Sequence, residues 1–532
     1  MHRNKSVNVH RFAMTPSPEI PRSSFNIQKS HKTTFDAGFL IPIYVDEVLP
    51  GDTFRLSMTA FCRLATPLFP IMDNMYLESF FFFVPNRLVW SNWTKMMGEQ
   101  DAPGDSIDFT VPQSESPIGG YAVGSLQDYM GLPTAGQVEP ASRILHSAMW
   151  LRAYNMIYNE WFRDENLQTP VVEAKGNGPD APSDFVLLRR GKRHDYFTSC
   201  LPWPQKGESV SIPLGTSAPI LAYGDKIPLW RVEGLGADHV LEGVTGTANV
   251  QLDGAPASSG RLAWNDPKLF ADLSDATAAT INQLRQSFQV QKLLERDARG
   301  GTRYTEILRS HFGVQSPDAR LQRPEYLGGG STPIQVNPIA QNSATSESGT
   351  GTPLGTLGAM GTGLAAGHGF SASFVEHGMV IGLVSLRADL NYQQGLRKMW
   401  SRKTRYDYYF PAFAMLGEQS VLSKEIYCDG TAGDETVFGY QERWAEYRYN
   451  PSIVSGLFRS TSAGTLDAWH LAQRFDNRPG LNTQFIQETP PLDRVLAVPS
   501  TTGKQLICDT FFNIHAARPL PLYSVPGLID HF

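Results

Sequence analysis

One segment of the chain combines the side-chain types that bind nucleic acid. Residues 396–409 (LRKMWSRKTRYDYY) interleave cations with aromatic rings. Cations neutralise phosphates and aromatic rings stack on unpaired bases, so this mixture suits single-stranded nucleic acid. The candidate contacts are Arg397, Lys398, Trp400, Arg402, Lys403 and Arg405. The alternative is that these arginines pair with carboxylates at subunit contacts, and the sequence leaves both interpretations open.

A second group of cations lies in residues 187–197 (LLRRGKRHDYF). It comprises Arg189, Arg190, Lys192 and Arg193. For this group we favour the structural interpretation, in which the arginines pair with carboxylates at subunit contacts.

The sequence carries no recognisable catalytic signature: GxSxG, HExxH, Walker A and HxE…CxxC motifs are all missing. The glycines of RPEYLGGGSTP (323–333) resemble a phosphate cradle, but a P-loop needs a lysine before its Ser/Thr, and none is present. Pro333 and the β-branched residues after it favour extended chain over a helix, so we predict a glycine-rich turn or loop. We therefore predict no enzyme activity, no catalytic residue and no cofactor.

Metal binding is also poorly supported. Residues 429–435 (DGTAGDE) hold three acids around two glycines, but they lack the alternating ligands of an EF-hand loop. A solvated turn is the better interpretation, and we predict no metal site. The four cysteines (Cys62, Cys200, Cys428 and Cys508) form no CxxC motif, and we expect free thiols in a reducing compartment.

Charge is distributed unevenly along the 532 residues, whose net charge is −6. Residues 1–34 have a net charge of +5, and residues 208–280 have a net charge of −5. This asymmetry predicts two surfaces in different environments. The amino-terminal segment has no apolar core typical of a signal peptide, so we expect a soluble product that is not secreted. Its cations are further candidate nucleic-acid contacts: Arg3, Lys5, Arg11, Arg22, Lys29 and Lys32.

Strands must position most of these segments. Alternation, aromatic runs and flanking turn residues predict strands over 38–49, 52–64, 75–85, 371–388 and 504–514. Apolar residues at helical spacing predict helices over 140–163, with Pro140 near its start, and near 277–296. Residues 1–34 are polar enough to form a disordered arm. Strands at both ends of the chain favour a Greek-key β-sandwich with large insertions.

Several long segments closely resemble the major capsid proteins of microviruses, and the gokushovirus branch matches best. They include GDTFRLSMTAFCRLATPLFPIMDNMYLESFFFFVPNRLVW (51–90), HFGVQSPDARLQRPEYLGGGSTPIQVNPIAQ (311–341) and RADLNYQQGLRKMWSR (387–402). KRHDYFTSCLPWPQKG (192–207), YDYYFPA (406–412) and RPLPLYSVPGLIDHF (518–532) add to the likeness. The resemblance spans most of the chain and is weak only over about 208–280.

This resemblance implies a mainly β fold, an eight-stranded antiparallel jelly roll with large loop insertions and a few helices. It also implies a domain layout, which we combine with the charge pattern. We expect a basic interior arm (1–34), a first part of the jelly roll with a helical insertion (35–207), an outward-protruding insertion (208–280), and a second part of the jelly roll with a long Gly-rich loop at 327–369 (281–532).

The function implied by the resemblance is that of a major capsid protein. About 60 copies would form a T=1 icosahedral shell around a circular single-stranded DNA phage genome, one chain per symmetry unit. The implied partners are the chain itself, the genome, an internal scaffolding protein, a small basic DNA-packaging protein, a pilot protein and a host-surface receptor. The chain would reside in the virion, and in the host cytoplasm during assembly.

The insertion at 208–280 is the implied host-attachment element, because the most exposed loops of a shell meet the cell first. Trp230, Trp264 and Phe270 are candidates for its small core or for a three-copy contact. The alternative functions are a glycan-binding, fibre-like protein and a β-sandwich enzyme acting on carbohydrates.

Overall fold

The computed structural model describes residues 21–210, 281–342 and 354–523, apart from Pro499 and Thr502, and within 211–280 it describes the backbone of six short strands. Two compact units are present. The larger one comprises residues up to Pro204 and from Arg299 onward, and the smaller one comprises Gln205–Ala298.

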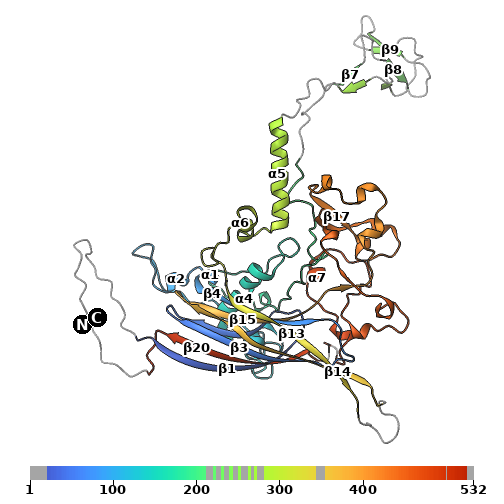
Figure 1. Ribbon diagram of the computed structural model, residues 1–532. Helices are drawn as coiled ribbons and strands as arrows, with labels where there is room; N and C mark the ends of the chain where they lie inside the picture. The colour runs from blue at the N-terminus through green and yellow to red at the C-terminus, as the bar shows by residue number, and fades with distance from the viewer. Residues whose placement is uncertain are drawn as a thin grey trace. The chain divides into compact units, whose positions relative to one another are not determined.

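The larger unit is built on one eight-stranded antiparallel sheet in the order β1-β20-β3-β14-β13-β4-β15-β2 (Figure 1). Its halves, β1-β20-β3-β14 and β2-β15-β4-β13, pair early strands with late ones, as a jelly roll does. The predicted eight-stranded antiparallel jelly roll is therefore confirmed. The strands are β1 (Ser23–Phe35), β2 (Ile41–Val48), β3 (Thr53–Leu64), β4 (Met75–Pro85), β13 (Glu325–Ala340), β14 (Leu357–Ser373), β15 (Gly378–Ala388) and β20 (Leu506–Arg518).

The core lies between the two halves. Strand β3 alternates as expected, and its even-numbered side chains from Phe54 to Leu64 are all buried. Strand β4 is buried on both faces, which explains its aromatic run. Phe81 and Phe83 enter the core between the halves, whereas Phe82 enters a second apolar cluster that includes helix α4 (Met149–Ile157).

The glycine-rich stretch lies in a strand. The loop predicted over 327–369 is therefore wrong for 327–340, which belong to β13, and for 357–369, which belong to β14, while residues 343–353 lie outside the described residues. Gly328, Gly329 and Gly330 sit in β13 opposite β4, and β13 and β14 form a long hairpin. A Cβ atom on Gly329 would lie 2.0 Å from the carbonyl oxygen of Ser79, and one on Gly330 would lie 2.5 Å from the His368 ring. The glycines therefore permit close backbone approach, as expected, but between strands and not in a loop.

Two other predictions need correction. Residues 23–34 of the predicted arm belong to β1, an edge strand paired with β20 along its whole length. Because β1 is exposed on both faces over most of its length, its side chains are polar and resemble those of a disordered segment. The helix predicted over 140–163 begins only at Met149 and ends in a π-helical turn at Tyr158–Phe162, because Leu145–Ser147 forms strand β6 with β5 (Gln113–Glu115).

Two large insertions interrupt the jelly roll. The first, between β4 and β13, holds α1 (Asn86–Val89), α2 (Trp93–Met96), α3 (Leu126–Tyr129), α4, α5 (Ile281–Gly300) and α6 (Tyr304–Phe312). The second, between β15 and β20, holds β16 (Asn391–Tyr392), β17 (Glu418–Leu422), β18 (Val437–Glu442), β19 (Ser452–Ile453) and α7 (Thr483–Ile486). No helix among the described residues has the length and apolarity needed to cross a membrane.

The smaller unit contains the charged insertion predicted over 208–280 and most of α5. Its short strands are β7 (Ile220–Ala222), β8 (Leu229–Val232), β9 (His239–Gly243), β10 (Val250–Leu252), β11 (Leu262–Trp264) and β12 (Leu269–Ala271). Strands β10-β9-β8-β11 form one sheet, and β12-β7 form another.

Candidate nucleic-acid interface

The basic and aromatic segment 396–409 lies in the second insertion, just after β16. It consists of short 3₁₀ turns at Lys398–Ser401 and Arg405–Asp407. The Asp407 carboxylate accepts hydrogen bonds from the backbone N–H groups of Thr404 (2.7 Å) and Lys403 (2.9 Å), which hold the pKa of Asp407 below its usual value. This cap fixes the direction of the chain between the two turns.

Two of the predicted cations are paired with carboxylates of the same chain. The Lys398 ammonium donates to the carbonyl oxygen of Ser420 at 2.9 Å and lies 3.6 Å from Glu425. The Arg402 guanidinium lies 3.2 Å from Glu446 and 4.5 Å from the centre of the Tyr447 ring. Part of the positive charge is thus neutralised locally, as in the structural interpretation, but the pairs form within the chain.

Three of the four remaining members are exposed, and Arg397 is half-buried. Trp400 is 70% exposed, and Lys403 and Arg405 are also exposed. The Arg405 guanidinium lies over the rings of Tyr406 and Phe410, with its carbon 5.7 and 5.6 Å from their centres. Arg397 donates to the Asn450 side chain at 2.6 Å.

A cavity of about 530 Å³ gathers four of the six predicted residues, namely Arg397, Lys398, Trp400 and Arg402. Further lining comes from Tyr392 in the same stretch and from distant parts of the chain, including Tyr196, Tyr447 and Tyr449. Cations beside several aromatic rings suit an unpaired base with its phosphate. Lys403 and Arg405 are not part of this lining.

The predicted contacts of the amino-terminal segment lie elsewhere. Arg3, Lys5 and Arg11 are outside the described residues. Arg22 donates to the Thr53 hydroxyl, and Lys29 lies over the Tyr44 ring, with its ammonium 5.3 Å from the ring centre. Lys32 is 72% exposed and forms an ion pair with Asp509 at 3.1 Å.

The cations of residues 187–197 form an internal network, not a free basic surface. Arg190, Arg193 and Arg387 all bind the carboxylate of Glu78. Burial alone would raise the pKa of Glu78, but the charges of Arg190 and Arg387 hold it below its usual value. Pairing with carboxylates is thus the role of Arg190 and Arg193, although the partners belong to the same chain. Arg189 instead donates to the backbone carbonyl oxygens of Ala37 and Glu488, and Lys192 donates to the side chain of Gln473.

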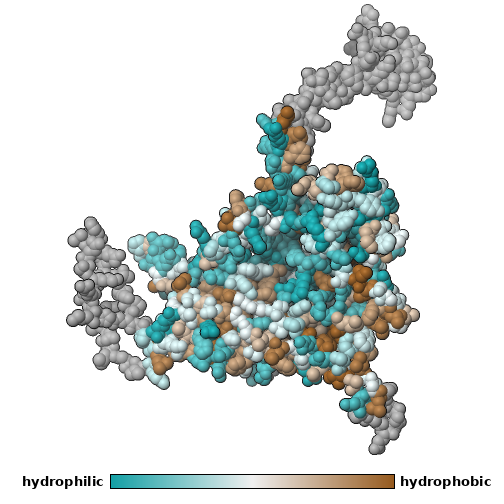
Figure 2. Space-filling model, in the orientation of Figure 1, coloured by the Kyte–Doolittle hydropathy of each residue, from teal (hydrophilic) through white to brown (hydrophobic). Residues whose placement is uncertain are grey.

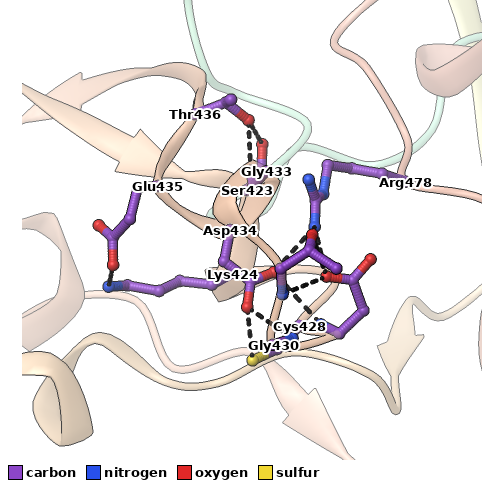
Figure 3. A network of polar contacts seen from close by, with 11 residues as sticks. Ser423, Lys424, Cys428, Gly430, Gly433, Asp434, Glu435, Thr436 and Arg478 are labelled. Carbon is purple, nitrogen blue, oxygen red and sulfur yellow. Dashed lines mark hydrogen bonds and ion pairs between the residues drawn. The ribbon is translucent and has the colours of Figure 1, made fainter.

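The acidic turn at 429–435 is also held by an arginine (Figure 3). Asp434 accepts hydrogen bonds from the Gly430 N–H (2.9 Å) and from Arg478 (2.9 Å), and Arg478 also binds Asp429 at 2.8 Å. The guanidinium supplies the positive charge that these carboxylates need. Among the described residues, no three His, Cys, Asp or Glu side chains cluster as metal ligands do. All four cysteines are free.

The aromatic candidates of the smaller unit fall on its short strands. Trp230 of β8 lies directly opposite Trp264 of β11 in the backbone register. Phe270 lies on β12, which pairs with β7 in a separate sheet. The register therefore brings the two tryptophan positions together and leaves Phe270 in the other sheet.

Comparison with known proteins bears on the whole chain. Residues 13–528 match the family described as capsid protein (F protein). The chain is 47% identical to capsid protein VP1 of Bdellovibrio phage phiMH2K, covering 99% of both chains. It is 43% identical to capsid protein VP1 of Chlamydia phage 1 and 36% identical to that of Spiroplasma virus 4, covering 98% of each chain. These matches confirm the resemblance to microvirus capsid proteins, and the chain therefore belongs to the capsid protein (F protein) family, whose members build virions.

Proposed function

We propose that about 60 copies of this chain assemble into a T=1 icosahedral shell that encloses a circular single-stranded DNA genome. The observation that carries this proposal is the eight-stranded jelly roll with its two large insertions. The insertions provide surfaces through which symmetric copies of the chain could meet. The second insertion supports it further. Large side chains such as Met415 (95% exposed), Leu416 and Tyr406 crowd its surface, and permanent interfaces cover side chains of this type.

Electron microscopy of purified material tests the shell. We expect small isometric particles whose nucleic acid resists added nuclease until the particles are opened. Soluble monomers without protected DNA would contradict both the T=1 shell and the enclosed genome.

We further propose that the cavity beside Trp400 contacts the packaged DNA from the inner surface of the shell. Arg397, Lys398, Trp400 and Arg402 would line it, and Lys403 and Arg405 would extend it. A Trp400→Ala variant should form particles whose DNA is released at lower temperature. If subunits in an assembled particle cover Trp400 with protein, this contact is excluded.

The amino-terminal cations would add to DNA packaging, since phosphates inside a shell need nearby cations. Replacing Arg3, Lys5 and Arg11 with glutamine should lower the DNA content per particle. Unchanged DNA content and particle stability would count against this role, and would favour a segment that ties neighbouring subunits together.

Host attachment is the role we propose for residues 208–280. Their net charge of −5 disfavours contact with DNA, and their short strands form sheets separate from the jelly roll. Replacing 215–275 with a short Gly/Ser linker should leave particles intact but unable to adsorb to cells. Failure to assemble would instead assign the insertion to bracing the shell, and normal infection would exclude both roles.

Assembly in the host cytoplasm would involve the partners that accompany such capsid proteins: an internal scaffolding protein, a small basic DNA-packaging protein and a pilot protein. Expression of this chain alone tests the need for them. Closed shells from the isolated chain would show that scaffolding is dispensable.

A further inference from the structure

The outward face of β1-β20-β3-β14 is an open sheet surface. Along β3 every odd-numbered side chain from Arg55 to Arg63 is exposed, and on β20 Ile507, Asp509, Phe511 and His515 are exposed. In Figure 1, β1, β20 and β3 form the underside, and the labelled helices α1, α2, α4 and α6 lie on the other side. Figure 2 shows hydrophobic side chains reaching this lower surface among hydrophilic ones.

Two aromatic rings occupy neighbouring positions near the middle of this face. Phe61 of β3 is 49% exposed and Phe511 of β20 is 43% exposed. Phe61 pairs with Asp509, and Phe511 pairs with Thr59, so the two phenylalanines are diagonal neighbours. Diagonal side chains on adjacent strands stand roughly 7 Å apart, within reach of the same ligand. Exposed aromatic rings on adjacent strands of an open sheet are the arrangement that stacks unpaired bases.

The surroundings of the two rings are polar and positively charged. Arg55 and Arg63 are exposed on β3, and Lys32 of β1 faces Asp509 of β20, so three cations accompany one acid. Ser57 and Thr59 stand between Arg55 and Phe61 along the exposed face of β3, and Ser30 of β1 pairs with Phe511. Leu364 of β14 extends the apolar part beside Phe61.

The chemistry of this face favours one class of ligand over the others. A small basic protein would be repelled by its net positive charge. The core of a permanent interface with a second copy is depleted of charges, whereas here arginines flank the rings. Phosphates suit the cations, and bases suit the rings.

We propose that the outward face of β1-β20-β3-β14 binds single-stranded DNA, with bases stacked on Phe61 and Phe511 and phosphates on Arg55 and Arg63. This inference rests on the proposed function, because a shell that holds unpaired DNA supplies the ligand. It deepens that function, because the face that points away from the core of the chain would then line the inside of the shell. This site is separate from the cavity beside Trp400, and its binding of DNA would not depend on the nucleotide sequence.

Binding of the full chain, obtained by dissociating particles, to a fluorescein-labelled oligothymidylate tests the stacking. A Phe61→Leu/Phe511→Leu variant keeps apolar side chains and strand propensity but removes both rings. We expect its affinity to fall about tenfold or more, as loss of base stacking does elsewhere. An Arg55→Gln/Arg63→Gln variant should reduce the slope of log affinity against log salt by about 1.4, for two lost phosphate contacts on a single strand.

The matched control is Leu364→Ala, which trims an apolar neighbour of Phe61 without removing a ring, and it should leave the affinity within twofold. Ultraviolet irradiation of intact particles locates the contact independently. Nucleotide adducts should appear on the tryptic peptides 56–63 and 505–532, because trypsin does not cleave the bond between Arg518 and Pro519.

Unchanged affinity of the leucine variant, or adducts only on other peptides, would overturn the inference while leaving the DNA-filled shell intact. Particles that lack protected DNA altogether would instead overturn the proposed function. Burial of Phe61 and Phe511 against a second copy in assembled particles would assign the face to subunit contact and also overturn the inference.

Discussion

Glu488 of the second insertion tests how burial of a carboxylate affects the stability of the folded chain. Its side chain is 1% exposed, its Oε2 atom has no hydrogen-bond partner among the described residues, and its Oε1 atom accepts only a long bond (3.5 Å) from the Ala388 N–H. Burial raises the pKa of Glu488 to about 7, although Arg387, Lys192 and Arg190 act in the opposite direction. Burial of the ionised carboxylate therefore costs free energy, and the attraction of the three cations does not fully offset this cost.

The sign of the pH dependence follows from this shift. In the unfolded chain Glu488 ionises near pH 4.5, whereas in the folded chain it holds its proton until about pH 7. Between these values the folded state binds more protons, so stability falls as pH rises. The difference between a pKa of 4.5 and one of about 7 corresponds to roughly 3 kcal/mol, which destabilises the folded state above pH 7 and is absent below pH 4.5.

The perturbation is Glu488→Gln, which keeps the shape of the side chain and removes its charge. We expect the variant to gain up to about 3 kcal/mol of unfolding free energy at pH 8 and to match the wild-type chain at pH 4.5. Urea unfolding of dissociated subunits, followed by tryptophan fluorescence at both pH values, measures this difference without the contribution of assembly.

Glu78 provides the control, because its carboxylate is paired with arginines whereas that of Glu488 is not hydrogen-bonded to them. Glu78 binds three arginines, and its pKa is lowered, so Glu78→Gln should lose stability at pH 8. If Glu488→Gln also destabilises at pH 8, Glu488 forms a favourable ion pair with the cations around it, and the reasoning from burial is wrong.

Three further predictions concern the fold and the sheet face. Gly329→Ala should destabilise the chain by about 3 kcal/mol, because its Cβ would lie 2.0 Å from a backbone carbonyl of β4, whereas Gly358→Ala, with its nearest atom at 3.7 Å, should be nearly neutral in thermal unfolding. Arg152→Met should cost about 4 kcal/mol in urea unfolding by leaving the buried carboxylate of Asp180 unpaired, and adding Asp180→Leu should recover most of the loss. Asp509→Asn removes an acid from the DNA-binding face and should tighten oligothymidylate binding severalfold in fluorescence anisotropy; weaker binding would count against the sheet-face site.

The strands that bury a full face were predictable from the sequence. Strand β3 alternates between buried and exposed positions, and β4 combines five aromatic residues with burial on both faces, so the predicted range 75–85 matches the structure and 52–64 differs by one residue. Strand β1 was not predictable by this route. It lies at the edge of the sheet and few of its side chains are buried, so its sequence shows no hydrophobic periodicity that would predict a strand.

The glycine stretch illustrates a different limit. Three consecutive glycines weaken a strand by any local propensity, and they predict a turn. They are tolerated in β13 because β4 and the buried His368 ring approach too closely for a side chain, a contact between residues far apart in the sequence.

The candidate site was predictable in its residue types but not in their pairing. Trp400 and its neighbouring cations stand out in the sequence, and the structure gathers four of them around one cavity. Whether an arginine is free or neutralised depends on distant partners such as Glu446, which follows Arg402 by 44 residues. The local composition is the same for a free arginine and a neutralised one, so only the fold distinguishes the two.

Mass measurement of intact particles tests the central claim most directly. At 58.9 kDa per chain, a shell of 60 copies has a protein mass of about 3.5 MDa. We predict this mass for emptied particles, and a larger mass for filled ones that falls to the empty value when a single-strand-specific nuclease acts on opened particles. A different copy number would contradict the T=1 shell, and a content that resists this nuclease after release would contradict a single-stranded DNA genome.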